Sequence, residues 1–133
     1  MNGYGILKFN NGSLYKGEWK RNRYDGFGEY IHPGIKKYYG FFREDKRYGF
    51  GIEVRFKERK ILIGFWKDNN IGIFGKLFVN EKIIYGIWKN GKLVETFNKR
   101  EFLKKIKREH KNYLNFFVLD DCDAILSVVN EKI

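Results

Sequence analysis

The sequence predicts a mainly β protein: an elongated single-layer antiparallel sheet of consecutive hairpins, followed by one or two α-helices. Three observations support this prediction. A pattern of glycine and aromatic residues recurs about every 23 residues, and the composition includes 15 Gly, 13 Phe, 9 Tyr and 3 Trp. Aromatic side chains favour strands, and glycine favours tight turns. After Phe97 the spacing of the apolar residues becomes helical.

Length and composition limit the class of protein. A chain of 133 residues with 43% hydrophobic residues can form one domain with a core, which excludes a wholly disordered chain. A single cysteine excludes a disulfide framework and a zinc site of thiolates. No segment approaches the roughly 20 apolar residues that span a bilayer. The start resembles neither a signal peptide nor a myristoylation motif. We therefore expect a cytoplasmic protein that is not secreted.

The strand region is expected to cover residues 1–97 as about four repeat units, the first of which is incomplete. A glycine between two apolar or aromatic residues recurs at 15–19, 38–42, 62–66 and 84–88. Three units in phase are typical of a repeat architecture. The glycines expected to be structural are Gly17, Gly26, Gly28, Gly40, Gly49, Gly51, Gly64, Gly75 and Gly86.

Side-chain alternation predicts how each unit is built. Residues two apart share a face of a strand, so Tyr15, Gly17 and Trp19 point to one side, and Phe27 is expected on the other. We expect the glycine between two aromatic residues to leave space for a ring from the neighbouring hairpin. The polar segment 20–25 suits the hairpin turn. Together these features predict a one-dimensional ribbon of hairpins.

These residues resemble the MORN (membrane occupation and recognition nexus) repeat. Its pattern is Tyr-x-Gly-x-Trp or Phe, then a short polar turn and Gly-x-Gly, and the resemblance extends from residue 3 to about residue 94. It implies an elongated, twisted sheet. It also implies a scaffold or adaptor at cytoskeletal structures, cilia, cell-division rings or membrane contacts. Ile73, Glu95 and Phe97 replace glycines of the pattern, so the geometry of the last two hairpins is left open.

Residues 98–133 form a second region with helical spacing. Apolar residues between 102 and 117 recur at steps of three and four, which predicts one amphipathic helix, and Asn98 suits its N-cap. Asp120 and Asp123 suit the N-terminus of a second helix. This region is expected either to cap the degenerate last hairpin or to dock a partner. The expected buried residues of the second helix are Ile125, Leu126 and Val129.

No arrangement typical of catalysis is found. His32 lies beside a Pro-Gly turn and His110 lies on the basic helix, and neither has a nucleophile at a recognisable spacing. The acidic run 120–123 lacks the alternating ligands and the glycine of a calcium loop. We therefore expect a non-enzymatic protein without a metal or a cofactor. Cys122, next to acidic residues, is expected to be structural.

A protein partner is the first expectation for binding. A single-layer sheet cannot bury both of its faces, so some aromatic residues are expected to stay partly exposed in a groove that binds a helix or an extended peptide. The competing interpretation is that the C-terminal helix occupies this groove. The candidate residues are Tyr15, Trp19, Tyr38, Phe42, Trp66, Tyr85 and Trp88.

An anionic phospholipid surface is the alternative. Of the net charge of +11, +9 lies on residues 1–97, and residues 55, 57 and 59 are expected to share one face of a strand. Basic turns aligned by the repeat would form a ridge, and each cation near a membrane contributes about 1 kcal/mol. A solubilising surface explains the same charge. The candidate residues are Lys20, Arg21, Arg23, Arg43, Lys46, Arg47, Arg55, Lys57, Arg59 and Lys60.

The sequence as a whole therefore predicts a non-catalytic scaffold or adaptor, cytoplasmic and associated with the cytoskeleton or a membrane. Specific binding of nucleic acid is not expected, because the repeat already accounts for the aromatic residues. Open strand edges permit a homodimer or an end-to-end oligomer.

Overall fold

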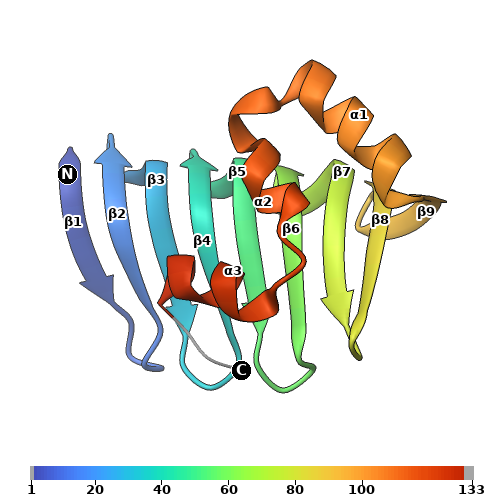
Figure 1. Ribbon diagram of the computed structural model, residues 1–133. Helices are drawn as coiled ribbons and strands as arrows, with labels where there is room; N and C mark the ends of the chain where they lie inside the picture. The colour runs from blue at the N-terminus through green and yellow to red at the C-terminus, as the bar shows by residue number, and fades with distance from the viewer. Residues whose placement is uncertain (1, 131–133) are drawn as a thin grey trace.

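The computed structural model describes residues 2–130. Met1 and residues 131–133, which belong to the ends of the two predicted regions, lie outside the described residues. Within 2–130 the chain forms one nine-stranded antiparallel sheet in sequence order, followed by helices (Figure 1), which confirms the predicted fold class. The strands are β1 (Gly3–Lys8), β2 (Leu14–Lys20), β3 (Arg23–His32), β4 (Lys36–Arg43), β5 (Lys46–Arg55), β6 (Lys60–Lys67), β7 (Asn70–Val79), β8 (Lys82–Lys89) and β9 (Lys92–Phe97).

One row of glycines crosses the sheet. Each strand from β1 to β8 places a glycine opposite a glycine of its neighbour, as in the pairs Gly17 with Gly28 and Gly40 with Gly51. The row forms because each repeat returns its pair of strands to the same register. Its members are Gly5, Gly17, Gly28, Gly40, Gly51, Gly64, Gly75 and Gly86.

The first glycine of each Gly-x-Gly pair has a left-handed backbone. The φ angle is 100° at Gly26 and 89° at Gly49, where the register between the strands shifts. Ile73 occupies the equivalent position in β7 and adopts a φ of 48°. This hairpin therefore keeps the left-handed backbone of the earlier repeats although an isoleucine replaces the glycine. The φ angle is unfavourable for a β-branched residue. Glu95 and Phe97 lie in β9 opposite Ile87 and Tyr85 of β8, and the register shifts beside Glu95, between Ile87 and Trp88.

Helices follow the sheet directly: α1 (Lys99–Glu109), the 3₁₀ turn η1 (Lys111–Tyr113), α2 (Leu114–Val118) and α3 (Cys122–Val129). The side chain of Asn98 accepts a hydrogen bond from the backbone N–H of Glu101 at 2.8 Å, as expected for an N-cap. Asp121, and not Asp120, caps α3, because its carboxylate accepts from the N–H groups of Asp123 and Ala124.

The prediction of one continuous helix over residues 102–117 is wrong. The helix ends before His110, whose φ of −141° is not helical, and the chain turns back through η1 into α2. A straight helix would hold Phe102 and Phe117 about 22 Å apart, since each residue adds about 1.5 Å. Their ring centroids are instead 5.5 Å apart, and both side chains are fully buried. Burying both rings on one sheet therefore requires the break.

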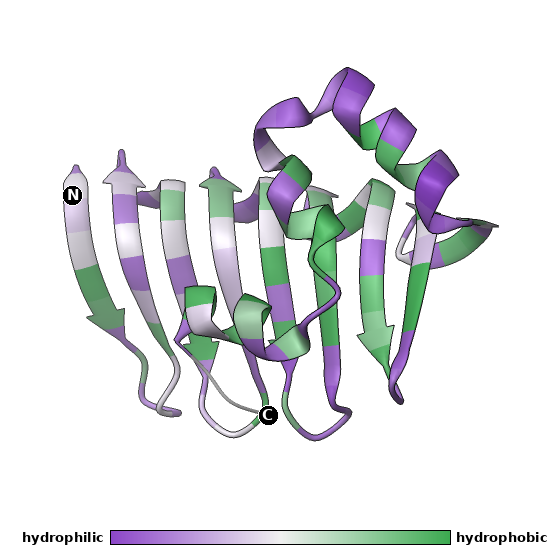
Figure 2. Cartoon of the chain, in the orientation of Figure 1, coloured by the Kyte–Doolittle hydropathy of each residue, from purple (hydrophilic) through white to green (hydrophobic). Residues whose placement is uncertain are grey.

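The two faces of the sheet are covered differently. On the helix face, the face that carries Phe27, Phe50 and Phe74, the helices pack over β4 to β8 (Figures 1 and 2). Helix residues such as Phe117 form a core there with strand residues such as Ile63. The opposite face is here called the ring face. Among the described residues its core is a row of rings and aliphatic side chains from the strands alone. The predicted buried residues Ile125, Leu126 and Val129 all lie in the core of the helix face.

Candidate binding surfaces

The rings of the ring face lie over the row of glycines. A Cβ atom added at Gly28 would stand 2.5 Å from the Tyr15 hydroxyl oxygen, and one at Gly17 would stand 2.5 Å from the Cα of Gly28. Tyr15 and Gly28 belong to one hairpin. In this hairpin the space above the glycines is therefore filled by its own tyrosine. At Gly75 the ring comes from the neighbouring hairpin, as the sequence suggested, because a Cβ atom there would stand 2.9 Å from the ring of Trp88 in β8. The Tyr15 hydroxyl donates to the carbonyl oxygen of Glu18 at 2.8 Å.

The seven aromatic residues predicted to line a partner groove are all buried, with exposed fractions between 0% and 9%. The expected partial exposure is wrong, because the rings cover one another in edge-to-face pairs: the ring centroids of Tyr38 and Trp66 are 5.5 Å apart. Tyr85 lies on the helix face, near Phe102. The other six form one cluster without a helix residue, so the C-terminal helix does not occupy this face: Tyr15, Trp19, Tyr38, Phe42, Trp66 and Trp88. Partner binding by these rings stays a prediction.

The ten basic residues predicted to form a ridge lie at opposite ends of the strands (Figure 1). The ten residues of β5 separate the two groups by about 30 Å, at about 3.3 Å per residue. Lys57 and Arg59 lie in a turn, so they do not share a strand face with Arg55 as expected. The turns after β2 and β4 carry Lys20, Arg21, Arg23, Arg43, Lys46 and Arg47, whereas the turn after β5 carries Arg55, Lys57, Arg59 and Lys60.

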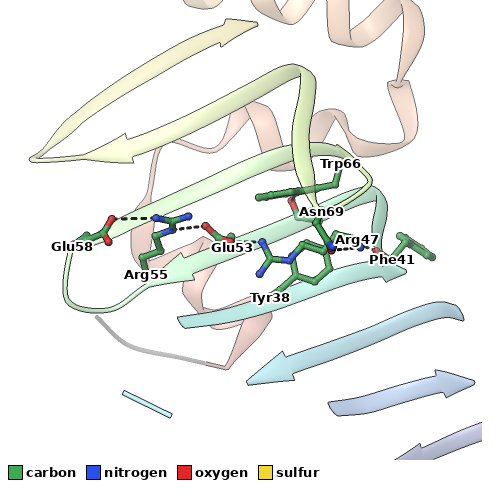
Figure 3. Close-up of polar contacts among 9 residues, drawn as sticks. Tyr38, Phe41, Arg47, Glu53, Arg55, Glu58, Trp66 and Asn69 are labelled. Atoms are coloured by element: carbon green, nitrogen blue, oxygen red, sulfur yellow. Dashed lines mark hydrogen bonds and ion pairs between the residues drawn. The ribbon is translucent and has the colours of Figure 1, made fainter. Parts of the chain in front are cut away.

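Two of these arginines hold a buried carboxylate on the ring face (Figure 3). Glu53 is only 2% exposed, and it pairs with the guanidinium group of Arg47 and with Arg55 Nε at 2.6 Å. The guanidinium of Arg47 also lies over the rings of Tyr38 and Trp66, at 4.6 Å and 5.0 Å from their centroids. The sequence placed Arg47 and Arg55 on a lipid-binding ridge, but the structure turns Arg47 inward.

The electrostatics of this cluster favour charged groups. Burial alone would raise the pKa of the Glu53 carboxyl, but the guanidinium groups of Arg47 and Arg55 lower it below its ordinary value. The hydrogen bond to Glu53 raises the pKa of Arg55. Both shifts favour the charged forms of Glu53 and Arg55 at neutral pH.

A cavity of about 390 Å³ opens beside this cluster. Its polar lining includes Lys36, Arg55 and Asn70, and its apolar lining includes Trp66 and Trp88. Lys36 lies directly opposite Arg55 in the register of β4 and β5. Cations, amide groups and apolar walls therefore meet in one concave site, which is the usual composition of a ligand pocket.

The helix face is open over the first strands. Tyr4, Ile6 and Phe27 are 69%, 56% and 36% exposed. Phe27 contacts Tyr39 and Phe41 edge to face, with ring centroids 4.8 Å and 5.6 Å away. We call Phe27, Tyr39 and Phe41 the aromatic platform. Exposed clusters of large apolar residues mark interaction sites.

Lysine side chains fasten the helices to the other part of the helix face. Lys76 is fully buried, and its Nζ donates to the carbonyl oxygens of Phe117 and Leu119 and to the Asp120 carboxylate. Asp120 also pairs with Lys99 and accepts from the Tyr85 hydroxyl. Burial lowers the pKa of Lys76. For Asp120 burial acts in the opposite direction, and its hydrogen bonds to the lysines outweigh it and lower its pKa. The expectation that Asp120 caps a helix is wrong, because it anchors one.

The sequence analysis did not predict that side chains in the turns accept hydrogen bonds from the backbone of the preceding hairpin. Asp45 accepts from the backbone N–H of Tyr24 at 2.8 Å, and Asn69 accepts from that of Arg47 at 3.0 Å. Each turn thereby binds the irregular part of the preceding hairpin. The signal was present: Asn22, Asp45 and Asn69 stand at the same place in successive repeats, 23 and 24 residues apart.

The residues considered for catalysis are dispersed. His110 stacks on Phe65 with ring centroids 3.7 Å apart, whereas His32 lies at the end of β3. Within residues 2–130 there is no group of three metal-ligating side chains. Cys122 is half-buried, and burial together with its acidic neighbours raises its thiol pKa. None of the helices described is both long and apolar enough to cross a membrane.

The comparison with protein families agrees with this geometry. The family model of the MORN repeat matches residues 1–14 and 15–34. No curated protein matches the chain. MORN repeats are generally non-catalytic modules of protein or membrane interaction. The resemblance inferred from the glycines and aromatic residues is confirmed: residues 1–34 carry MORN repeats.

Proposed function

We propose that this chain is a non-catalytic MORN-repeat scaffold or adaptor that binds an amphipathic helix of a protein partner on its aromatic platform. The proposal places it in a cytoplasmic assembly associated with the cytoskeleton, as at a cilium, or with a membrane. The observation that supports it best is the contrast between two equivalent positions of the repeat. Phe50 is covered by the chain's own helices, and Phe27, 23 residues earlier, is not.

The chain itself shows which occupant suits this surface. Phe50 stacks on Tyr113, with centroids 4.3 Å apart, and also contacts Phe116 at 4.9 Å. One repeat earlier, Phe27 has ring contacts only within the sheet, to the other members of the platform. A short helix with aromatic residues on one side therefore fits the platform as α2 fits its own part of the sheet.

The platform is continuous with the helical cover. A cavity of about 310 Å³ lies between them and is lined by Phe41, Phe50 and Tyr113. A partner helix there would extend the existing interface between sheet and helices. The polar rim is formed by Glu29, which pairs with Lys16 and Lys37 at 4.0 Å and 3.8 Å.

Site-specific photo-crosslinking in cells tests this proposal. A benzophenone amino acid at position 27 is expected to yield a defined protein adduct. The same probe at position 94, where exposed Val94 lies at the far end of the sheet, is the control. Loss of the adduct on Phe41→Ala in a folded variant would support the platform. Equal adducts from positions 27 and 94, or no adduct from either, would contradict it.

A peripheral membrane module that binds anionic phospholipid is the second candidate. It is favoured by five exposed cations in the turns after β2 and β4, which lie at the same end of the strands: Lys20, Arg21, Arg23, Arg43 and Lys46. Sedimentation with vesicles of phosphatidylcholine and phosphatidylserine tests it, because electrostatic attachment must weaken as salt rises. Arg21→Gln with Arg43→Gln should release the protein. Lys57→Gln with Arg59→Gln removes the same charge at the other end of the strands and should not release the protein.

A further inference from the structure

We infer that the cavity beside Glu53 on the ring face binds an acidic peptide segment, with a carboxylate of that peptide held between Arg55 and Lys36. This site lies on the opposite face from the aromatic platform. The inference rests on the proposed function in one respect, because both take the ligand to be part of a protein. The inference is drawn from the sheet register, the repeat and the charges around the cavity.

The repeat does not require the ion pair of Arg47 and Glu53. At the position of Arg47, opposite an aromatic ring of the preceding strand, the neighbouring units carry Tyr24 and Ile71. At the position of Glu53 they carry Tyr30 and Leu77. Those side chains pack in the apolar cluster of the ring face. An ion pair at such a place adds little stability over apolar residues, because both charges lose water. A different role for it is therefore indicated.

That role is to orient Arg55. Its Nε is bound to Glu53 and its guanidinium also approaches Glu58, at 3.5 Å. A guanidinium has five N–H donors, so about three remain for a ligand. The side chain is 46% exposed, at the lining of the cavity. Glu53 thus acts as a positioning residue that presents a fixed cation to an incoming anion.

A row of like charges faces the ligand. Lys36, Arg55 and Lys60 are directly opposite one another across β4, β5 and β6. Like charges at such positions destabilise a sheet. Glu58 approaches Arg55 and Lys60, but within residues 2–130 the Lys36 side chain has no hydrogen-bond or ion-pair partner. A bound carboxylate would supply the missing negative charge.

The apolar walls favour a peptide over a bare phosphate. Leu62 lines the cavity where the two earlier units carry Tyr15 and Tyr38, and a leucine fills less space than a tyrosine. Trp66 and Trp88 form further apolar walls. An apolar side chain next to an acidic one would use both parts of the site, whereas a phosphate would use only the cations.

The probe for the test is a fluorescein-labelled peptide of alternating glutamate and phenylalanine, and the readout is fluorescence anisotropy with the full chain. Lys36→Gln and Arg55→Gln should each weaken binding about tenfold, the loss that follows from one charge-assisted hydrogen bond. Lys57→Gln is the matched control, since Lys57 is exposed in the adjacent turn and the charge change is the same. Equal losses for all three variants would show diffuse attraction and overturn the site.

A charge-neutral variant sharpens the test. Arg47→Ile combined with Glu53→Leu installs the pair that the third unit carries, so the sheet should fold and the net charge is unchanged. Peptide binding should fall about tenfold, because Arg55 loses its anchor. Unchanged binding by this folded variant would overturn the inference. So would loss of phosphatidylserine vesicle binding, without loss of peptide binding, in Lys36→Gln and Arg55→Gln.

The same assays separate this site from the platform. Phe27→Ala should leave peptide binding unchanged, and the charge-neutral variant should leave the crosslink from position 27 unchanged. A crosslink without peptide binding would refute the ring-face site alone. Peptide binding without a crosslink would refute the platform alone.

Discussion

The two parts of the helix face are built from the same repeat but differ in their cover. Phe50 and Phe74 are 6% and 7% exposed beneath the helices, whereas Phe27 is 36% exposed and Tyr4, on the first strand, is 69% exposed. The ring face needs no such cover, because its aromatic rings lie over glycines and over one another. The comparison shows that the repeat completes only one of its faces. Burial of the helix face depends on the helices that pack against it.

Truncation of an aromatic side chain in the helices that cover the sheet should have the largest effect on stability. Phe117 is fully buried against Phe50, Phe65 and Phe102. Phe117→Ala should lower the free energy of unfolding by about 3–5 kcal/mol. Phe27→Ala, on the open part of the same face, should cost less than about 1 kcal/mol. Urea denaturation followed by tryptophan fluorescence measures both. Equal losses would mean that the open part is as fully packed as the covered part.

Filling the row of glycines should have the next largest effect. A Cβ atom at Gly51 would overlap the ring of Tyr38, whereas one at Gly72 would stand 3.7 Å from the carbonyl oxygen of Phe65, an ordinary contact. Gly51→Ala should therefore destabilise the protein by about 3 kcal/mol, and Gly72→Ala by less than about 1 kcal/mol. Thermal unfolding of the two variants compares them directly. A small effect at Gly51 would refute the interlock between ring and glycine.

A change in the opposite direction is expected at Ile73. This residue is 61% exposed and has a left-handed backbone that disfavours β-branched side chains. Ile73→Gly should raise the free energy of unfolding by about 0.5–1 kcal/mol, after allowance for the greater freedom of glycine in the unfolded chain. Gly49→Ile, at the equivalent position, should lower it. Destabilisation by Ile73→Gly would show that the isoleucine side chain makes a contact worth more than the backbone strain.

The smallest effect is expected in the dependence of stability on acidic pH. The folded pKa of Glu53 lies below its ordinary value of 4.5, so its stabilising contribution is present above that pH and is lost as the pH falls through the folded pKa. Urea midpoints between neutral and acidic pH should therefore decrease less steeply in Glu53→Gln than in the unchanged protein. Asp120, whose pKa is also lowered, continues to titrate in both. Identical slopes would exclude Glu53 as a source of the acid sensitivity.

The sequence determined the sheet because the relevant interactions are local and repeated. The phased glycines and aromatic residues predicted the hairpins and the opposite face of Phe27, and Asn98 predicted the start of the first helix. Each of these features depends on residues within one or two repeat lengths. Side-chain alternation and turn preferences act over the same distances.

Tertiary structure alone decided what each face becomes. Burial of Tyr15 and Trp66 depends on rings from other strands, and the pairing of Lys76 with Asp120 joins residues 44 positions apart. The break before His110 arises because Phe102 and Phe117 must reach the same part of the sheet. Spacing along the chain shows which side chains share a face. Whether that face meets solvent, a ring or a helix depends on distant contacts, and these form only when the sheet and its cover pack together.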